Sequence, residues 1–374
     1  MTPPNERPRL VFVTQLLDPQ DPVLGFVVTW IEALAAECAH LDVIALEART
    51  TIELPNVAVW SLGKERAIGK VGRAIEYFKA LRRITSASRP DSILAHMCPI
   101  YLNLAYPLAK FEGIRKILWY AHPARNATLV LAERLADAIL TSFAGAYPGG
   151  SSKVRVIGQG IDIARLTPSP PPQGPLKLLA LGRTSASKGL ETAVKAMSLL
   201  EGNAREATLR IVGPATNARE RAYRDWLKLL IDELGLQKTV FIEQAVTHTE
   251  VPGLIATASC LVSTTIEGSG DKVVLEAMAS GRPVIASNLV YKPLLEGLQV
   301  RAWFPDGDAT ELARRIEDLS AASATERLET GKALRVRVKN DHSVSHWARE
   351  VAKVAGGARG HGQAPPKKIG RLRS

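Results

Sequence analysis

The feature that most constrains the fold of this chain is an alternation of short apolar runs and amphipathic segments along most of its length. The apolar runs predict strands over 9–14, 42–46, 57–60, 92–95, 116–120, 138–141, 154–157, 176–181, 207–213, 239–242, 260–264 and 283–286. Helical periodicity predicts helices over 27–39, 68–84, 188–199, 218–234, 272–280, 309–319, 325–338 and 344–355. Because strands that alternate with helices are typical of parallel sheets, we predict an α/β fold with two doubly wound parallel-sheet domains facing a central cleft.

The chain of 374 residues is long enough for two domains, each with its own core. A proline-rich stretch over 166–175 reads as a stiff linker and predicts the domain boundary. The first domain is then expected over 1–165 and the second over 176–340, followed by a helix over 341–355 and a tail over 356–374. Two such domains predict a ligand in the cleft between them, at the carboxyl ends of the strands.

The net charge of +11 favours an anionic partner, such as a nucleotide, a phosphorylated acceptor or a lipid surface. Part of this excess lies in the tail over 356–374, whose basic residues and Gly, Pro and Gln content predict disorder. Because that part of the excess is in a disordered segment and no base-stacking motif is seen, nucleic acid is not expected as a partner.

Two further features bear on location. No apolar run approaches the ~20 residues that a membrane-spanning helix needs. The cysteines Cys38, Cys98 and Cys260 have no paired spacing, which indicates a reducing compartment and argues against a disulfide framework or a metal site. We therefore expect a cytoplasmic protein, with peripheral attachment to the inner face of the membrane as a further expectation.

The segment over 64–83 is the basis for expecting membrane attachment. It combines interleaved apolar residues with the basic residues Lys64, Arg66, Lys70, Arg73, Lys79, Arg82 and Arg83. Such a pattern resembles an amphipathic basic helix that rests on anionic lipid. The alternative is a domain helix with a solvated basic face.

A glycine loop, a helix, a stop and a strand follow one another over 268–287. Gly268 and Gly270 allow the backbone to approach a ligand closely, and Asp271 is predicted as the N-cap of the helix. The free N–H groups of such a helix start suit a phosphate. Glu276 lies one turn further, outside the apolar face, where its carboxylate can accept hydrogen bonds from two hydroxyl groups of a sugar or ribose. The alternative is an ordinary helix with a solvated glutamate.

A second strand, loop and helix start over 178–189 places Arg183 and Lys188 at the carboxyl end of a strand. Two fixed cations there can stabilise a departing nucleoside diphosphate, whose negative charge grows in the transition state. The alternative is a loop with two solvated basic residues.

Polar residues that follow strands of the first domain are further candidates. His122 stands at a strand end, where a lone histidine has a structural role more often than a catalytic one. His96 also follows a strand, and it either lines an acceptor pocket or is satisfied in the core. Asp18 and Asp21 precede Gly25 in the loop after the first strand, where they either contact the acceptor or cap a turn.

The sequence Glu-Ala-Met-Ala-Ser-Gly-Arg-Pro-Val-Ile-Ala-Ser, which starts at Glu276, resembles the C-terminal motif of glycosyltransferase family 4. Members of this family are retaining enzymes of the GT-B fold that use nucleotide-diphosphate sugars. The resemblance covers about residues 8–355 and includes the family's Gly-Arg…Lys-Gly pattern over 182–189. It implies a donor site in the second domain, an acceptor site in the first, and a last helix over 344–355 that packs back on the first domain.

The resemblance also implies roles for individual residues. Glu276 matches the glutamate that binds the nucleotide ribose, and His122 matches a histidine near the reacting carbon of the donor sugar. With Arg183 and Lys188, His122 is expected to be catalytic. The expected donor-binding residues are Gly25, Gly268, Ser269, Gly270, Asp271, Lys272 and Glu276, and the expected acceptor-side residues are His96, Asp18 and Asp21.

The chain departs from the family at one position. The family's first glutamate, eight residues before Glu276, is replaced by Gly268, and Glu267 stands one residue too early. Either the loop bulges so that Glu267 reaches the donor sugar, or the backbone of the loop or Asp271 holds the sugar instead. We favour the second alternative, because the residues at 269–271 are small and suit a close backbone approach.

The function expected from the resemblance is sugar transfer from a nucleotide-diphosphate donor to a glycan or lipid-linked acceptor, with retention of configuration. Neither a cofactor nor a metal ion is expected, because cations and a helix start stand at the diphosphate. Synthesis of an envelope polysaccharide or glycolipid is the predicted context. The alternative is a non-catalytic module that binds nucleotide sugars, which the missing first glutamate favours.

Overall fold

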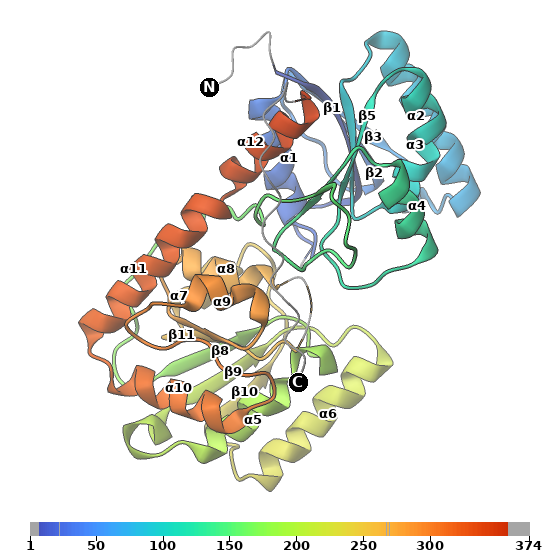
Figure 1. Ribbon diagram of the computed structural model, residues 1–374. Coiled ribbons are helices and arrows are strands. Elements are labelled where there is room, and N and C mark those ends of the chain that lie inside the picture. The colour runs from blue at the N-terminus through green and yellow to red at the C-terminus, as the bar shows by residue number, and fades with distance from the viewer. Residues whose placement is uncertain (1–6, 22, 267, 269, 358–374) are drawn as a thin grey trace.

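The protein has two α/β domains, one above the other in Figure 1, in a computed structural model that describes residues 7–21, 23–266, 268 and 270–357. The described part of the first domain contains a seven-stranded sheet in the order β3-β2-β1-β4-β5-β6-β7. That of the second domain contains a five-stranded sheet in the order β10-β9-β8-β11-β12. All neighbouring strands are parallel, which confirms the predicted fold class.

The strands of the first domain are β1 (Arg9–Leu17), β2 (His40–Ala48), β3 (Val57–Ser61), β4 (Ser92–His96), β5 (Arg115–Trp119), β6 (Ala138–Thr141) and β7 (Val154–Val156). Its helices are α1 (Phe26–Glu37), α2 (Lys70–Ala87), α3 (Pro99–Phe111) and α4 (Ala127–Leu135). The central strands β1, β4 and β5 are nearly continuous apolar runs, because helices cover both faces of the sheet.

The strands of the second domain are β8 (Lys177–Leu181), β9 (Thr208–Val212), β10 (Val240–Glu243), β11 (Cys260–Ser263) and β12 (Val284–Ala286). Its helices are α5 (Leu190–Leu199), α6 (Ala218–Glu233), α7 (Val251–Ala256), α8 (Lys272–Ala279), α9 (Lys292–Leu295), α10 (Ala309–Ala321) and α11 (Ala324–Asp341). Every predicted strand and helix is therefore present. Among the described helices, none is both long and apolar enough to cross a bilayer.

The last helix, α12 (Val344–Ala355), returns to the first domain and lies along α1 (Figure 1). Its buried residues Trp347, Ala348 and Val351 recur at helical spacing and join the core cluster that contains Trp30. Within residues 7–357, the described chain crosses between the domains at two places, and these two crossings are hydrogen-bonded to each other. Ile161 N donates to the carbonyl of His342 at 2.6 Å, and Val344 N donates to the carbonyl of Ile161 at 2.8 Å.

The proline-rich stretch over 166–175 lies on the second domain, so it does not form the boundary that the sequence predicts. Arg282 is buried and donates to the carbonyl of Ser169 at 2.8 Å and to that of Pro170 at 3.3 Å. The crossing lies earlier, at 157–161, where a Cβ on Gly158 would stand 1.9 Å from the carbonyl oxygen of Asp341. The predicted stiffness of this stretch remains a prediction, and the position of the boundary depends on which domain's side chains bind it.

Candidate functional site

A cavity of about 130 Å³ lies between the domains, at the carboxyl ends of strands of the second sheet. The first domain contributes Phe26 from the start of α1, and the second domain contributes residues that follow β8, β9 and β10 and the first turns of α8. Ligands of open α/β sheets bind at this edge, where backbone groups and helix starts face a common space.

The floor of this cavity is a contact between two glycines. Gly213, directly after β9, has a φ of +155°, and a Cβ there would stand 1.8 Å from the carbonyl oxygen of Gly182. Gly182 N in turn donates to the carbonyl of Val212 at 3.0 Å. The two strand ends therefore meet backbone to backbone, which leaves room for a ligand above them. From the sequence, Gly213 was predicted as part of a strand, and its close contact with Gly182 was not predicted.

Arg183 follows the contact between the glycines and lines the cavity. Its side chain is 54% exposed and lies 3.5 Å from Glu220, at the start of α6. The carboxylate of Glu220 also accepts a hydrogen bond from the hydroxyl group of Thr216 at 2.6 Å, which lowers its pKa. The guanidinium group of Arg183 is therefore held at the rim with its outer side open to an anion.

Lys188 lies in a small neighbouring hollow that Arg183 also lines. It forms an ion pair with Asp271 and receives, at its carbonyl, a hydrogen bond from the hydroxyl group of Thr264 at 2.7 Å. The structure thus brings the two predicted cations together near the end of β8, with Lys188 already paired to the loop that precedes α8.

Asp271 occupies the N-cap position of α8, as predicted, but its side chain does not cap the helix. Its carboxylate instead accepts from Thr265 Oγ1 at 2.6 Å and pairs with Lys188. The start of α8 therefore keeps N–H groups without a side-chain cap, together with the positive end of the helix dipole. This arrangement suits a phosphate better than the predicted cap does.

Glu276 lies one turn into α8 and lines the cavity together with Lys272. Burial raises the pKa of Glu276, and the nearby charges of Lys272 and Arg165 partly offset this shift. Burial also lowers the pKa of Lys272, to about 7. Of the two sequence interpretations of Glu276, the geometry favours a carboxylate that faces a ligand over one on a solvated helix face.

The glycines of the loop before α8 differ in their surroundings. Gly268 has a φ of +128° with nothing close to its Cβ position. A Cβ on Gly270 would stand 2.9 Å from ring atom Cε2 of Phe143 and 2.9 Å from the hydroxyl of Tyr291, so packing across the domain interface requires this glycine. Glu267 and Ser269 lie outside the described residues, and the choice between Glu267 and Asp271 as the sugar contact stays a prediction.

His122 lies on the exposed surface just after β5. Its Nδ1 accepts a hydrogen bond from Ala124 N at 3.0 Å, which stabilises the turn. The described residues that line the cavity beside Arg183 do not include His122. Its predicted catalytic role is therefore not supported by a contact in this arrangement of the domains and stays a prediction.

His96 is a core residue and does not line an acceptor pocket. It is 2% exposed, its Nδ1 lies 3.0 Å from Thr14 Oγ1, and its ring stacks on that of Phe12 at 5.8 Å. Burial lowers the pKa of His96 to about 3, so the imidazole is neutral at neutral pH. The sequence left two alternatives open for His96, and the structure shows the second one, a core histidine whose ring is hydrogen-bonded.

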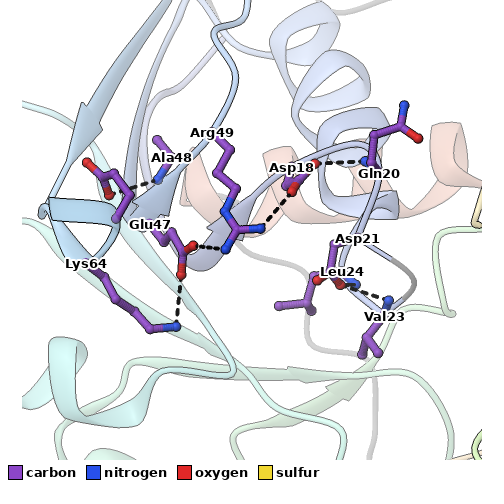
Figure 2. A network of polar contacts seen from close by, with 10 residues as sticks. Asp18, Gln20, Asp21, Val23, Leu24, Glu47, Ala48, Arg49 and Lys64 are labelled. Carbon is purple, nitrogen blue, oxygen red and sulfur yellow. Dashed lines mark hydrogen bonds and ion pairs between the residues drawn. The ribbon is translucent and has the colours of Figure 1, made fainter. Parts of the chain in front are cut away.

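Asp18 and Asp21 cap turns in the loop after β1 (Figure 2). Asp18 accepts from Gln20 N at 2.9 Å, and Asp21 accepts from Val23 N at 2.8 Å and from Leu24 N at 2.7 Å. Both carboxylates therefore cap turns, and their predicted contact with the acceptor remains a prediction.

Gly25 belongs to the same loop and closes it. A Cβ on Gly25 would stand 2.6 Å from the carbonyl oxygen of Asp21, so the tight turn itself requires a glycine. Gly25 is buried and is not among the described residues that line the cavity, so its expected contact with the donor remains a prediction.

Two titratable residues of the site, His248 and Arg165, were not predicted from the sequence. His248, in the loop after β10, lines the cavity, and burial lowers its pKa to about 4, with the charge of Arg165 acting in the same direction. Arg165 lines an adjoining cavity together with Lys272 and Glu276. The only signal for His248 was its place just beyond a strand end, which is too general to single out one residue.

Comparison with known proteins gives a match to one family model. Residues 166–335 match the model described as "Glycosyl transferases group 1". A curated relative, "Putative colanic acid biosynthesis glycosyltransferase WcaL" of Escherichia coli (strain K12), is 27% identical over 211 residues, which are 54% of this chain and 50% of the relative. The chain thus spans about half the length of this relative.

Two solved structures share the architecture. Sucrose-phosphate synthase from Thermosynechococcus elongatus aligns with a TM-score of 0.74 at 18% identity, over 92% of this chain and 98% of that one. Anabaena Alr3699/HepE in complex with UDP and glucose aligns with a TM-score of 0.70 at 18% identity, over 94% of this chain and 100% of that one. At these identities the likeness shows the fold, which is the GT-B arrangement of two parallel-sheet domains.

Proposed function

We propose that this chain is a glycosyltransferase that uses a nucleotide-diphosphate sugar, because residues 166–335 match the model of the glycosyl transferases group 1 family. One observation carries the proposal. Arg183, the uncapped start of α8 and the Glu276 carboxylate all face one cavity between the domains. A cation, the N–H groups of a helix start and a carboxylate are the groups that a diphosphate followed by a ribose needs.

In this proposal the diphosphate lies at the start of α8 and beside Arg183, and the ribose hydroxyl groups donate to Glu276. When the bond from the sugar to the diphosphate breaks, the electron pair leaves with the diphosphate and its negative charge grows. Arg183 and the dipole of α8 stabilise that charge without moving. Lys188 keeps the loop in place through Asp271.

Retention of configuration and independence from a metal ion are proposals as well. The acceptor oxygen attacks the face from which the diphosphate departs, and its proton passes to a phosphate oxygen, so configuration is retained. No metal ion is needed to neutralise the leaving group, because Arg183, Lys188 and the helix start supply positive charge there. A role of His122, which follows the carboxyl end of β5, at the donor sugar remains part of this proposal.

The names of relatives suggest the context. WcaL is named for colanic acid biosynthesis, and HepE was solved with UDP and glucose. We therefore propose an envelope polysaccharide or glycolipid as product and a UDP-sugar as the first donor to test. A thermal-shift screen of UDP-, GDP- and ADP-sugars tests donor binding, because a bound donor raises the unfolding temperature by mass action.

A lipid surface is proposed as a further partner because of the exposed face of α2. Val71, Ile75 and Phe78 are 77%, 50% and 39% exposed and follow helical spacing along one stripe. The basic residues Lys70, Lys79, Arg82 and Arg83 surround this stripe. An apolar stripe flanked by cations suits peripheral contact with anionic lipid.

A non-catalytic nucleotide-sugar-binding module is the second candidate. It is favoured by the glycine at 268, where the family has a glutamate that contacts the donor sugar. Release of free nucleoside diphosphate from a bound donor separates the two functions, since a binding module releases none.

A further inference from the structure

Lys272 connects the donor side of the second domain with the first domain. It is the first residue of α8, and its ammonium group donates to the carbonyl of Gln159 at 3.0 Å. The same nitrogen lies 3.6 Å from the centre of the Phe26 ring and 4.4 Å from that of the Trp30 ring. An ammonium group over two aromatic faces and at a carbonyl oxygen is held by three attractions at once.

The receiving side of this contact is rigid. Trp30 is 1% exposed, and its Nε1 donates to the carbonyl of Gly160 at 2.8 Å. Its ring centre lies 3.9 Å from that of Trp347 on α12 and 5.2 Å from that of Trp119 on β5. The lysine is therefore attached to the packed core of the first domain, where α1 and α12 lie side by side (Figure 1).

The other side of the contact is the start of α8. Lys272 lines both cavities of the cleft, as does Glu276 one turn later. Any displacement of Lys272 moves the first N–H groups of α8 relative to the first domain.

We propose that Lys272 is an inter-domain positioning residue, whose ammonium group ties the start of α8 to Phe26, Trp30 and Gln159 and so holds the two domains closed. The proposal rests on the proposed function, in which these N–H groups receive the donor diphosphate and the first domain receives the acceptor. This contact of Lys272, called the tether below, keeps the two reactants in one relative position, which transfer between domains requires.

The tether depends on the charge of the lysine. Burial lowers the pKa of Lys272 to about 7, and Glu276 opposes this shift. The charged form, and with it the tether, is therefore present below about pH 7 and is lost as the pH rises above it. A diphosphate beside the ammonium group would favour the charged form, so donor binding and closure strengthen each other.

Other titratable groups face Lys272, and they must be separated from it. Glu276 lies on the same helix, and Asp162 and Arg165 line the adjoining cavity from the crossing segment. His248 faces it from the loop after β10 and His96 from β4, and burial lowers the pKa of these histidines to about 4 and about 3. Both are neutral between pH 6 and 8.5, so they do not change charge in the range where Lys272 does.

Small-angle X-ray scattering of the ligand-free protein at pH 6 and pH 8.5 tests the proposal without any nucleotide. We expect the wild type to have a larger radius of gyration at pH 8.5 than at pH 6. Lys272→Met should have the larger value at both pH values, and Lys272→Arg the smaller value at both, because a guanidinium group keeps its charge.

The control is Lys292→Met, since the Lys292 ammonium group lies 4.6 Å from the centre of the Trp303 ring within the second domain. At each pH, the radius of gyration of this variant should equal that of the wild type. At pH 6, a radius of gyration that is unchanged in Lys272→Met relative to the wild type would overturn the proposal. Because no donor is present, these outcomes are independent of whether the protein transfers sugar.

Discussion

The centre of the Trp347 ring lies 3.9 Å from that of the Trp30 ring, although the two residues stand far apart in the sequence. Trp347 belongs to α12 and Trp30 to α1, so the last described helix completes the core of the first domain. Two crossings therefore join the domains, at 157–161 and 341–344, and they are hydrogen-bonded to each other at Ile161.

Glu276→Gln should weaken binding of the free nucleoside diphosphate by about ten- to a hundredfold. The variant keeps the shape of the side chain but removes a charged acceptor for the ribose hydroxyl groups, and such a bond contributes roughly 1.5–3 kcal/mol. Calorimetry with UDP or with the diphosphate of the donor found in the screen measures the effect. Glu296→Gln, an exposed residue of the same domain, is the matched control. Equal affinities of Glu276→Gln and the wild type would show that Glu276 does not contact the nucleotide.

Gly213→Ala should destabilise the second domain, by on the order of 3 kcal/mol. The added Cβ would stand 1.8 Å from the carbonyl oxygen of Gly182, so the ends of β8 and β9 must separate. Gly253→Ala is the control, because a Cβ there meets nothing within 4 Å. Thermal unfolding of both variants measures the difference, and equal unfolding temperatures would mean that the strand ends are not packed as described.

Acid should destabilise the protein in part through His96. Burial lowers the pKa of His96 to about 3, whereas an unfolded histidine has a pKa near 6.5. The unfolded chain therefore binds a proton that the folded protein excludes, and stability falls as the pH falls from about 6.5 towards 3. Between pH 7 and pH 4.5 the loss from this residue is about 2–3 kcal/mol.

Urea unfolding at pH 7 and pH 4.5 measures this loss. We expect the difference between the two pH values to be smaller in His96→Gln than in the wild type. His122→Gln is the control, since His122 is exposed. If His96→Gln and the wild type lose the same stability, His96 is not the buried neutral histidine described here.

Replacement of Val71, Ile75 and Phe78 by serine should reduce binding to anionic vesicles by about tenfold or more. The three side chains are exposed, so the fold should be retained, while the apolar area available for insertion is lost. Co-sedimentation with vesicles of phosphatidylglycerol and phosphatidylcholine measures binding. Serine at Trp226 and Leu229, which are exposed on α6 of the other domain, provides the control. Undiminished binding of the α2 variant would exclude this face as the lipid contact.

The architecture could be predicted from the sequence, because the alternation of strands with helices and the positions of glycines are local properties of the chain. Strand ends, helix starts and the placing of Arg183 beside Lys188 follow from spacing along the chain. The direction of a side chain was not predictable where several partners compete for it. Asp271 stands at the N-cap, yet its carboxylate goes to Lys188 and Thr265, and neither contact is visible in a periodicity.

Burial was the second property that the sequence could not supply. His96 and His122 both follow strands, yet one is in the core and the other is on the surface, because only His96 lies beneath α1 and its aromatic residues. The contact of Lys272 with Phe26 joins residues of different domains, so it depends on how the domains are placed. Local patterns do not contain that information.

The central claim is that Arg183 and the start of α8 receive the diphosphate of a sugar donor. The most direct test is the release of nucleoside diphosphate from a panel of UDP-, GDP- and ADP-sugars by the wild type and by Arg183→Ala, with Arg221→Ala on the exposed face of α6 as control. We predict that at least one donor is turned over and that Arg183→Ala slows its release by on the order of 10²-fold, while Arg221→Ala does not. Turnover of no donor in the panel, or equal rates for Arg183→Ala and the wild type, would contradict the account.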